Sequence, residues 1–140
     1  MATVNVRSMD GLQQEITAGK NVILADEPVE AGGGGTGLNP YELLLAALGA
    51  CKSMTVSMYA RRKGWDLQRV DVELNHEKDY ARDCVDCPEK NVKLDRITVR
   101  LRFTGNLDDD QRRRLREIAG RCPVHRTLTG QIEIVDVDAG

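Results

Sequence analysis

The chain has 140 residues and a mass of 15.5 kDa, and 41% hydrophobic with 30% charged residues is the composition of one soluble globular domain over residues 1–140. Twenty Lys and Arg against 22 Asp and Glu give a net charge of −2, which argues against the basic surface of a nucleic-acid-binding protein. We expect a cytoplasmic protein without a membrane span. The first ten residues lack a signal-peptide pattern, and the strongly apolar stretch 43–51 is far shorter than the roughly 20 residues that cross a bilayer.

Aromatic residues are scarce, at 4% of the chain, so the core must be built from aliphatic side chains. A small domain with such a core gains the apolar burial that it lacks when a second subunit covers it. The composition therefore favours a homodimer.

Two short β-type runs, 3–6 and 22–25, open the chain, with turn signals at Asp10-Gly11 and Gly19-Lys20 between them. The glycine-rich run 32–37 follows. It lacks the Lys-Ser/Thr pair of a phosphate-binding P-loop and the preceding strand of a dinucleotide-binding turn. We predict a flexible loop there that lets the backbone pass close to a functional site or to a partner subunit.

A long helix is predicted from Pro40 to about Lys63. Asn39 is a favourable N-cap, Pro40 suits the first helical position, and Glu42 completes a capping box. Gly64 ends the helix, and the basic residues 61–63 suit the negative end of its dipole. The first half of this helix is apolar on all sides, which is typical of a buried central helix.

The second half of the chain predicts two alternating strands, an amphipathic helix over 108–119 closed by Gly120, a short helical turn from Pro123, and a last strand through Ile132 and Ile134. The inward-facing residues of the two alternating strands are Val70, Val72 and Leu74 in the first and Ile97, Val99, Leu101 and Phe103 in the second. This order of elements predicts an α+β fold with two main helices grouped on an antiparallel sheet.

Cys122 precedes a proline and is predicted to cap the short helical turn that contains His125, with its sulfur facing unpaired backbone N–H groups. Arg121 and Arg126 are close to it in sequence. These features predict a thiol pKa below the ordinary value of cysteine, which favours reactivity. The alternative is an inert loop cysteine.

Cys51 lies about 18 Å along the long helix from its N-cap, beyond the reach of that helix's dipole. On position alone, it is interpreted as a small buried hydrophobic residue, as free cysteines often are. Its neighbour Lys52 points about 100° away around the helix.

Cys84 and Cys87 form a lone Cys-x-x-Cys motif in a polar segment. Zinc needs four ligands, and no second Cys pair or His pair at suitable spacing completes a set. We expect two incidental or auxiliary thiols, with no metal and no other cofactor. The alternative is a metal bound by this motif across a dimer, with His76 or Asp83 contributing.

Two segments, GLNPYELLLAALGAC (37–51) and CPVHRTL (122–128), resemble the signature segments of the OsmC/Ohr family, the osmotically inducible protein C and organic hydroperoxide resistance proteins. The order of strands and helices resembles that family as well. The resemblance implies an OsmC-like fold in an intertwined homodimer, with the long central helix buried and the active sites at the subunit interface.

The resemblance also implies a reaction. Cys51 would attack an organic hydroperoxide and become a sulfenic acid, and Cys122 would resolve it as a disulfide that an unidentified dithiol reduces. Glu42, His125 and Arg126 are the expected supporting residues. The predicted function is thus a peroxidase of oxidative stress defence, with small hydroperoxides and a reductant as partners and neither nucleic acid nor membrane.

Two departures from the family's peroxidases place the chain in a broader OsmC-like branch. Tyr41 stands where they carry a Glu directly after Asn-Pro, and the acid follows one residue later at Glu42. Their activating Arg has no counterpart between residues 8 and 60, which leaves Arg7 as the sole N-terminal candidate. The alternative function is a non-peroxidatic dimer that binds a small apolar or electrophilic ligand at the interface pocket.

Overall fold

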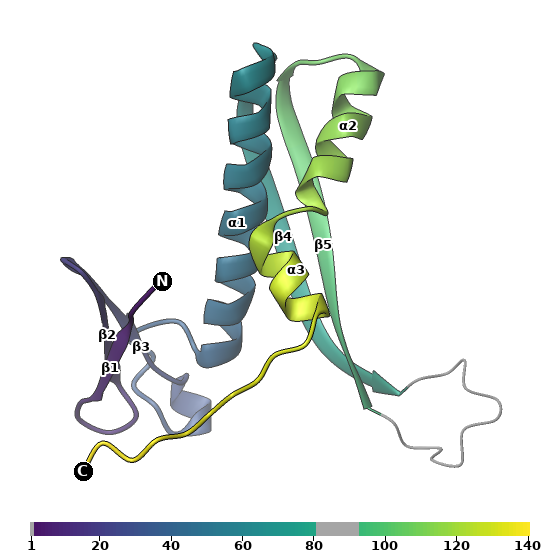
Figure 1. Ribbon diagram of the computed structural model, residues 1–140. Coiled ribbons are helices and arrows are strands. Elements are labelled where there is room, and N and C mark those ends of the chain that lie inside the picture. Colours follow the sequence, from purple (N-terminus) through teal and green to yellow (C-terminus); the bar gives the residue numbers. More distant parts are fainter. Residues whose placement is uncertain (1, 81–92) are drawn as a thin grey trace. The chain divides into compact units, whose positions relative to one another are not determined.

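The computed structural model describes residues 2–80 and 93–140 (Figure 1). Those residues form an α+β fold of short antiparallel sheets and helices, as the sequence predicts. They divide into two compact units, the first ending at residue 45 and the second beginning at residue 46, within the long helix. The Cys-x-x-Cys motif of Cys84 and Cys87 lies outside the described residues, and the predictions made for it stay predictions.

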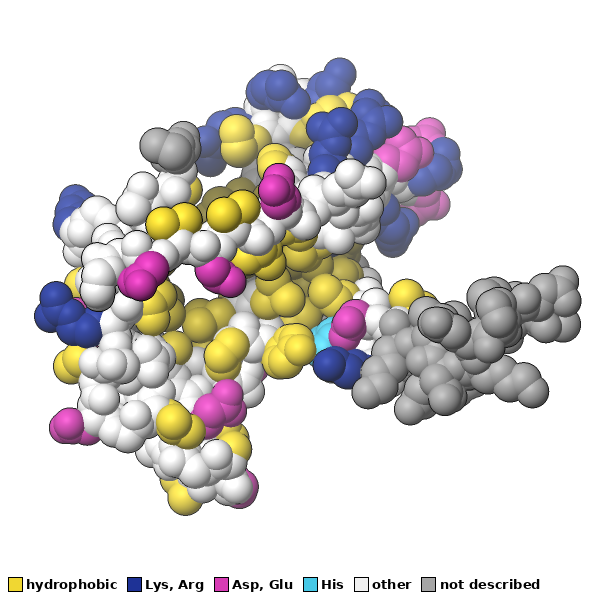
Figure 2. Space-filling model, turned by 60° about the horizontal axis from the view of Figure 1, so that its bottom comes forward, with side chains coloured by type: hydrophobic (Ala, Val, Ile, Leu, Met, Phe, Trp, Pro, Cys, Tyr) yellow, Lys and Arg dark blue, Asp and Glu magenta, His cyan; other side chains and the backbone are white. Residues whose placement is uncertain are grey.

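The first unit holds a three-stranded antiparallel sheet of β1 (Asn5–Ser8), β2 (Gln14–Ala18) and β3 (Asn21–Ala25). Gly11 and Gly19 have φ of +61° and +60°, the left-handed conformation that glycine adopts at little cost, and they lie in the two turns that the sequence predicts. The sequence predicts strands near β1 and β3 but does not predict β2. Several apolar side chains of this sheet are exposed, namely Val6, Val22, Ile23 and Leu24. Figure 2 shows hydrophobic side chains on the face of the molecule that is in view.

Asp26 organises the loop between β3 and the long helix. Its side chain is buried, and its carboxylate accepts hydrogen bonds from the Gly34 N–H at 3.1 Å, the Thr36 N–H at 3.2 Å and the Thr36 hydroxyl at 2.7 Å. The glycine-rich run is therefore held by a central acceptor. This finding corrects the prediction of a flexible loop.

Two glycines of the same loop are required by close backbone contacts. A Cβ atom at Gly33 would overlap the carbonyl oxygen of Glu27, and one at Gly37 would overlap that of Leu24. The glycines thus serve close packing of backbone on backbone. The predicted approach of this loop to a functional site or to a partner subunit stays a prediction. A short 3₁₀ helix, η1 (Val29–Ala31), completes the loop.

Replacing Asp26 with Ala should lower the thermal unfolding midpoint in a pH-dependent way. The hydrogen bond from the Thr36 hydroxyl, helped by the backbone donors, lowers the pKa of Asp26 from its ordinary value of 3.8. The carboxylate therefore stabilises the fold above that pH, and the stabilisation is lost as the pH falls through the lowered pKa. Melting followed by circular dichroism should show the largest difference between wild type and Asp26→Ala near neutral pH. A difference of equal size in strong acid would contradict this account.

The long helix, α1 (Pro40–Lys63), begins and ends where the sequence predicts. The Asn39 side chain accepts from the Glu42 N–H at 2.8 Å, and the Glu42 carboxylate accepts from the Asn39 N–H at 2.9 Å, which is a complete capping box. Gly64 follows with φ of +70°. An 18-residue window of α1 has a mean hydropathy of 1.4, so by length and composition alone the helix could cross a membrane. Core helices of soluble proteins pass the same test, so the expectation of a protein without a membrane span stays a prediction.

The second unit is built on a long antiparallel hairpin of β4 (Asp66–Tyr80) and β5 (Lys93–Asn106). The alternating apolar residues of the two strands pair in register, with Val70 opposite Phe103 and Val72 opposite Leu101. The rest of α1, then α2 (Asp109–Ala119) and α3 (Pro123–Thr129), lie along this hairpin (Figure 1). The buried core that joins these elements consists of Val56, Ala60, Phe103, Leu115, Ile118 and Ala119.

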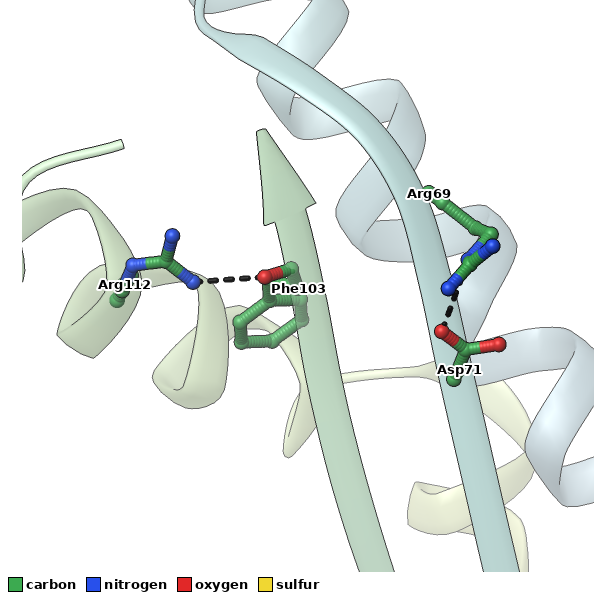
Figure 3. Close-up of polar contacts among 4 residues, drawn as sticks. All are labelled: Arg69, Asp71, Phe103 and Arg112. Carbon is green, nitrogen blue, oxygen red and sulfur yellow. Dashed lines mark hydrogen bonds and ion pairs between the residues drawn. The ribbon is translucent and has the colours of Figure 1, made fainter. Parts of the chain in front are cut away.

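Polar contacts fix α2 on the hairpin. Asp108 caps the helix through a capping box with Gln111. The Arg112 guanidinium donates to the Phe103 carbonyl oxygen at 2.7 Å and to the Gly105 carbonyl oxygen at 3.3 Å, so it binds the end of β5 to α2 (Figure 3). The other contact in that view, Arg69 with Asp71 at 3.0 Å, is an exposed ion pair along β4 and adds little stability.

The predicted last strand does not form in this chain. Residues 131–140 have no regular secondary structure, and the side chains of Ile132 and Ile134 are 54% and 82% exposed. A strand needs a neighbour for its backbone N–H and C=O groups, and none of the described strands pairs with this segment. The apolar pattern of a strand is present, but the described residues supply no neighbouring strand for it.

Candidate functional site

The second unit brings the two predicted catalytic cysteines together. The Val124 N–H donates to the Sγ of Cys51 at 3.5 Å, and the His125 N–H donates to the Sγ of Cys122 at 3.3 Å. Both cysteines are free thiols. Two consecutive backbone donors of α3 thus face two sulfurs, one from α1 and one from the residue before α3.

The sequence explains why Cys122 occupies this position. Pro123 fixes the first position of α3, and Cys122 before it has an extended backbone with ψ of 144°. From that N-cap position the sulfur reaches the N–H of His125, three residues on, as the sequence predicts. The Cys122 N–H in turn donates to the Ala119 carbonyl oxygen at 3.4 Å, which keeps the cysteine next to the end of α2.

The two thiols differ in exposure. Cys122 is 0% exposed, whereas Cys51 is partly exposed. Burial raises the pKa of Cys122 above its ordinary value of 9.0, the hydrogen bond from the His125 N–H lowers it, and the neighbouring Cys51 thiol raises it. The sequence predicts a lowered pKa for Cys122, and this is wrong because desolvation outweighs the helix donors. Arg121 and Arg126 are exposed and do not offset it.

A buried lysine lies beside the cysteines. Lys52 is 4% exposed, and its Nζ contacts the Ala119 carbonyl oxygen at 3.0 Å and the His125 Nδ1 at 2.9 Å. The sequence predicts that Lys52 points away from Cys51 around the helix and suggests no role for it. The burial of Lys52 could have been predicted from helical spacing. Residues 52, 56 and 60 lie on one side of the helix, and Val56 and Ala60 are in the core.

Each of the three predicted supporting residues, Glu42, His125 and Arg126, has different surroundings. His125 contacts Lys52, so it does lie at the site. Glu42 is engaged in the capping box with Asn39. Arg126 is exposed, and its backbone N–H closes the first turn of α3 on the Cys122 carbonyl oxygen at 3.1 Å.

A pocket of ≈ 210 Å³ lies between α1, β5 and α3. Its apolar walls are Leu48, Ile97, Val99 and Leu128, and its polar groups are Asp95, His125 and Thr129. Leu48 is one helical turn before the cysteine of α1, and His125 is shared with Lys52. Within residues 2–80 and 93–140, no group of three or more Cys, His, Asp and Glu side chains could hold a metal ion.

The family model described as "OsmC-like protein" matches residues 32–135, a span that includes Cys51, Cys122 and the helices α1, α2 and α3. The chain belongs to the OsmC family. This confirms the resemblance seen in the two signature segments. No protein of curated function matches the sequence significantly.

Solved structures agree on the fold. An OsmC-like protein from Mycoplasma pneumoniae is 17% identical, with 93% of this chain and 88% of that chain covered and a TM-score of 0.74. An osmotic stress induced and detoxification response protein from Psychrobacter arcticus is 24% identical, with 91% and 88% covered and a TM-score of 0.72. An organic hydroperoxide resistance protein from Legionella pneumophila is 21% identical, with 93% and 90% covered and a TM-score of 0.64.

Alkylation should distinguish the two thiols of this OsmC-family chain. At neutral pH, iodoacetamide should label Cys51 before Cys122, because Cys122 is buried and its raised pKa keeps it protonated. The order of labelling can be followed by peptide mass spectrometry on protein that carries Cys84→Ser and Cys87→Ser. Faster labelling of Cys122 in the folded protein would show that the site is built differently.

Proposed function

We propose that this OsmC-family chain is a thiol-dependent organic hydroperoxide reductase, with Cys51 as the peroxidatic and Cys122 as the resolving cysteine. The observation that carries the proposal is the pair of free thiols held at the start of α3 by the Val124 and His125 N–H groups. The two side chains are also hydrogen-bond neighbours of each other, which supports their pairing in a disulfide.

The exposure of the two cysteines supports their proposed roles. An incoming peroxide can reach Cys51, which is partly exposed, whereas Cys122 is shielded from it. The raised pKa of Cys122 keeps that thiol protonated and unreactive while Cys51 meets the substrate. The reverse assignment would require the buried thiol to react first.

The reaction has two steps. In the first, the Cys51 thiolate attacks the terminal oxygen of the hydroperoxide, the O–O bond breaks, and an alkoxide leaves and is protonated to the alcohol. The Val124 N–H helps to hold the negative sulfur. In the second, the Cys122 sulfur attacks the Cys51 sulfenic acid, the S–S bond forms, and the hydroxyl leaves as water. A dithiol then reduces the disulfide and becomes oxidised itself.

The names of structural neighbours support this choice. Besides the Legionella protein, a Vibrio cholerae neighbour is named as an organic hydroperoxide resistance protein with captopril bound in one of its active sites, at 22% identity, with 94% of this chain and 87% of that chain covered and a TM-score of 0.60. The apolar pocket beside Leu48 and His125 favours an organic hydroperoxide over hydrogen peroxide, because it can bury an alkyl group.

Two cysteine variants separate the two steps. Cys51→Ser should abolish consumption of an organic hydroperoxide such as cumene hydroperoxide, because the nucleophile is gone. Cys122→Ser should permit a single oxidation that stops at the sulfenic acid, which dimedone traps and mass spectrometry detects. Turnover that survives Cys51→Ser would overturn the assignment. Wild-type activity should be weaker than that of a family peroxidase that has a Glu directly after Asn-Pro and an activating Arg before the long helix.

We also propose that the active form is a homodimer. One face of α1 carries apolar side chains at successive turns, and Leu44, Met54 and Met58 there are 38%, 65% and 63% exposed. Helical spacing puts Cys51 on the same face. The apolar residues of the tail from 131 to 140 are also exposed. A second copy that covers this face of α1 would close the site of Cys51 and supply neighbours for the tail.

The dimer can be tested by sedimentation velocity. The wild type should sediment as a dimer at micromolar concentration, and Met54→Glu with Met58→Glu should shift it towards monomer, because charges on this face oppose apolar burial. Lys20→Glu, in the exposed turn between β2 and β3, is the control that should leave the dimer intact. A stable folded wild-type monomer at that concentration would refute the proposal.

The pocket beside α3 favours a second candidate function, a dimer that binds a small apolar or electrophilic ligand there. In that case the cysteines would bind or sense the ligand without turnover. Exposure to an organic hydroperoxide decides between the two functions. Oxidation of Cys51 supports the reductase, whereas two unreacted thiols beside an oxidised control peroxidase support the ligand-binding protein.

A further inference from the structure

Lys52 is a buried cation that the reaction described above does not use. Its Nζ has two neighbours within hydrogen-bond distance, the Ala119 carbonyl oxygen at 3.0 Å and the His125 Nδ1 at 2.9 Å. Among the residues that the structure describes, Lys52 forms no ion pair with a carboxylate. Burial of a charge without a countercharge opposes folding. A lysine kept in such a position is therefore a candidate for a functional role.

Both neighbours of Lys52 orient the ammonium without neutralising it. The Ala119 carbonyl is at the C-terminal end of α2, where the partial charge of the helix is negative. The second neighbour is the His125 Nδ1, a ring nitrogen that can accept a hydrogen bond from an ammonium group. His125 is therefore a positioning residue for Lys52.

Lys52 and Cys122 share a neighbour, because the Lys52 Nζ and the Cys122 N–H both donate to the Ala119 carbonyl oxygen, at 3.0 Å and 3.4 Å. Three groups face this thiol: Cys51 and Lys52 from α1, and the His125 N–H from α3. Lys52 lowers the pKa of Cys122 by Coulomb attraction to its thiolate, against burial and against Cys51, which both raise it.

We propose that Lys52, oriented by His125 and the end of α2, stabilises the Cys122 thiolate in the step that closes the disulfide. The inference deepens the proposed function, on which its place in the reaction rests. It assigns the buried lysine to the resolving step and leaves the attack on peroxide to Cys51.

The attraction of Lys52 takes effect after Cys51 has been oxidised. While Cys51 is a thiol or thiolate, its hydrogen bond and its charge oppose ionisation of Cys122. Oxidation turns Cys51 into a neutral sulfenic acid, so the repulsion from a Cys51 thiolate disappears and the attraction of Lys52 remains. Cys122 then attacks the Cys51 sulfur as a thiolate, and the proton that it gives up ends on the leaving hydroxide. The S–S bond forms, the S–O bond breaks, and hydroxide leaves and takes up a proton to form water. The sulfur of Cys122 is oxidised, and that of Cys51 is reduced.

A titration without peroxide tests the electrostatic part by itself. In a background of Cys51→Ser, Cys84→Ser and Cys87→Ser, the ultraviolet absorbance of the thiolate reports on Cys122 alone. Lys52→Gln keeps a donor for the Ala119 carbonyl and removes the charge, so the titration midpoint should move to higher pH. Lys63→Met removes the same charge from an exposed position of α1 and should leave the midpoint unchanged. An unchanged midpoint in folded Lys52→Gln would refute the proposal.

If Lys52→Gln does not fold, His125→Leu provides the same test, because it releases the ammonium from its position and should also raise the midpoint. Folding is checked by circular dichroism, and Lys52→Arg should restore most of the wild-type behaviour. A midpoint that moves as far with Lys63→Met as with these variants would also count against the proposal.

Rapid-mixing kinetics in the Cys84→Ser and Cys87→Ser background place the effect in the reaction. With one equivalent of organic hydroperoxide, Lys52→Gln should form the Cys51 sulfenic acid at the wild-type rate. At neutral pH it should then close the disulfide about three- to tenfold more slowly than the wild type. The effect is moderate because a more basic thiol is less ionised, whereas its thiolate is more nucleophilic. The difference should vanish at alkaline pH, which loss of structure alone would not produce.

Slowing of the first step alone would show that Lys52 serves Cys51, against the proposal. If the wild type forms no sulfenic acid, the proposed reductase function fails, while the titration still decides whether Lys52 stabilises the Cys122 thiolate.

Discussion

The site depends on the first turn of α3, where successive backbone N–H groups of Val124 and His125 each donate to a cysteine sulfur. This turn exists because Pro123 starts the helix and Cys122 caps it. The same turn places the His125 ring against Lys52 and the pocket wall. Without it, Cys51 would be one more half-buried residue of a long helix, and Cys122 would be a buried thiol without a partner.

Competition between burial and local attraction sets the properties of the site. Helix N–H groups and a lysine both favour a thiolate at Cys122, but desolvation is stronger and raises the pKa of its thiol. A buried thiol that stays protonated is suited to wait for its partner to be oxidised. Cys51, nearer to solvent, is suited to meet the substrate first. The two sulfurs thus have unequal roles although they face the same short helix.

Much of this arrangement could be predicted from sequence because local rules govern it. Asn39, Pro40 and Glu42 mark the start of α1, alternation marks β4 and β5, and the Cys-Pro pair marks α3. Features that depend on tertiary surroundings could not be predicted in this way. The sign of the pKa shift of Cys122 depends on how deeply it is buried, and the role of Asp26 depends on a loop that folds around it. The last strand was predicted from its pattern, yet it needs a neighbour that the described part of this chain does not supply.

The central claim is that an organic hydroperoxide converts the two thiols at α3 into one disulfide. The most direct measurement treats reduced protein carrying Cys84→Ser and Cys87→Ser with one equivalent of organic hydroperoxide and maps the linked peptides by mass spectrometry without reduction. The account predicts a single cross-linked species that joins Cys51 to Cys122 within one chain, with one equivalent of alcohol released. Recovery of both cysteines as free thiols, beside a control peroxidase that is fully oxidised, would contradict it.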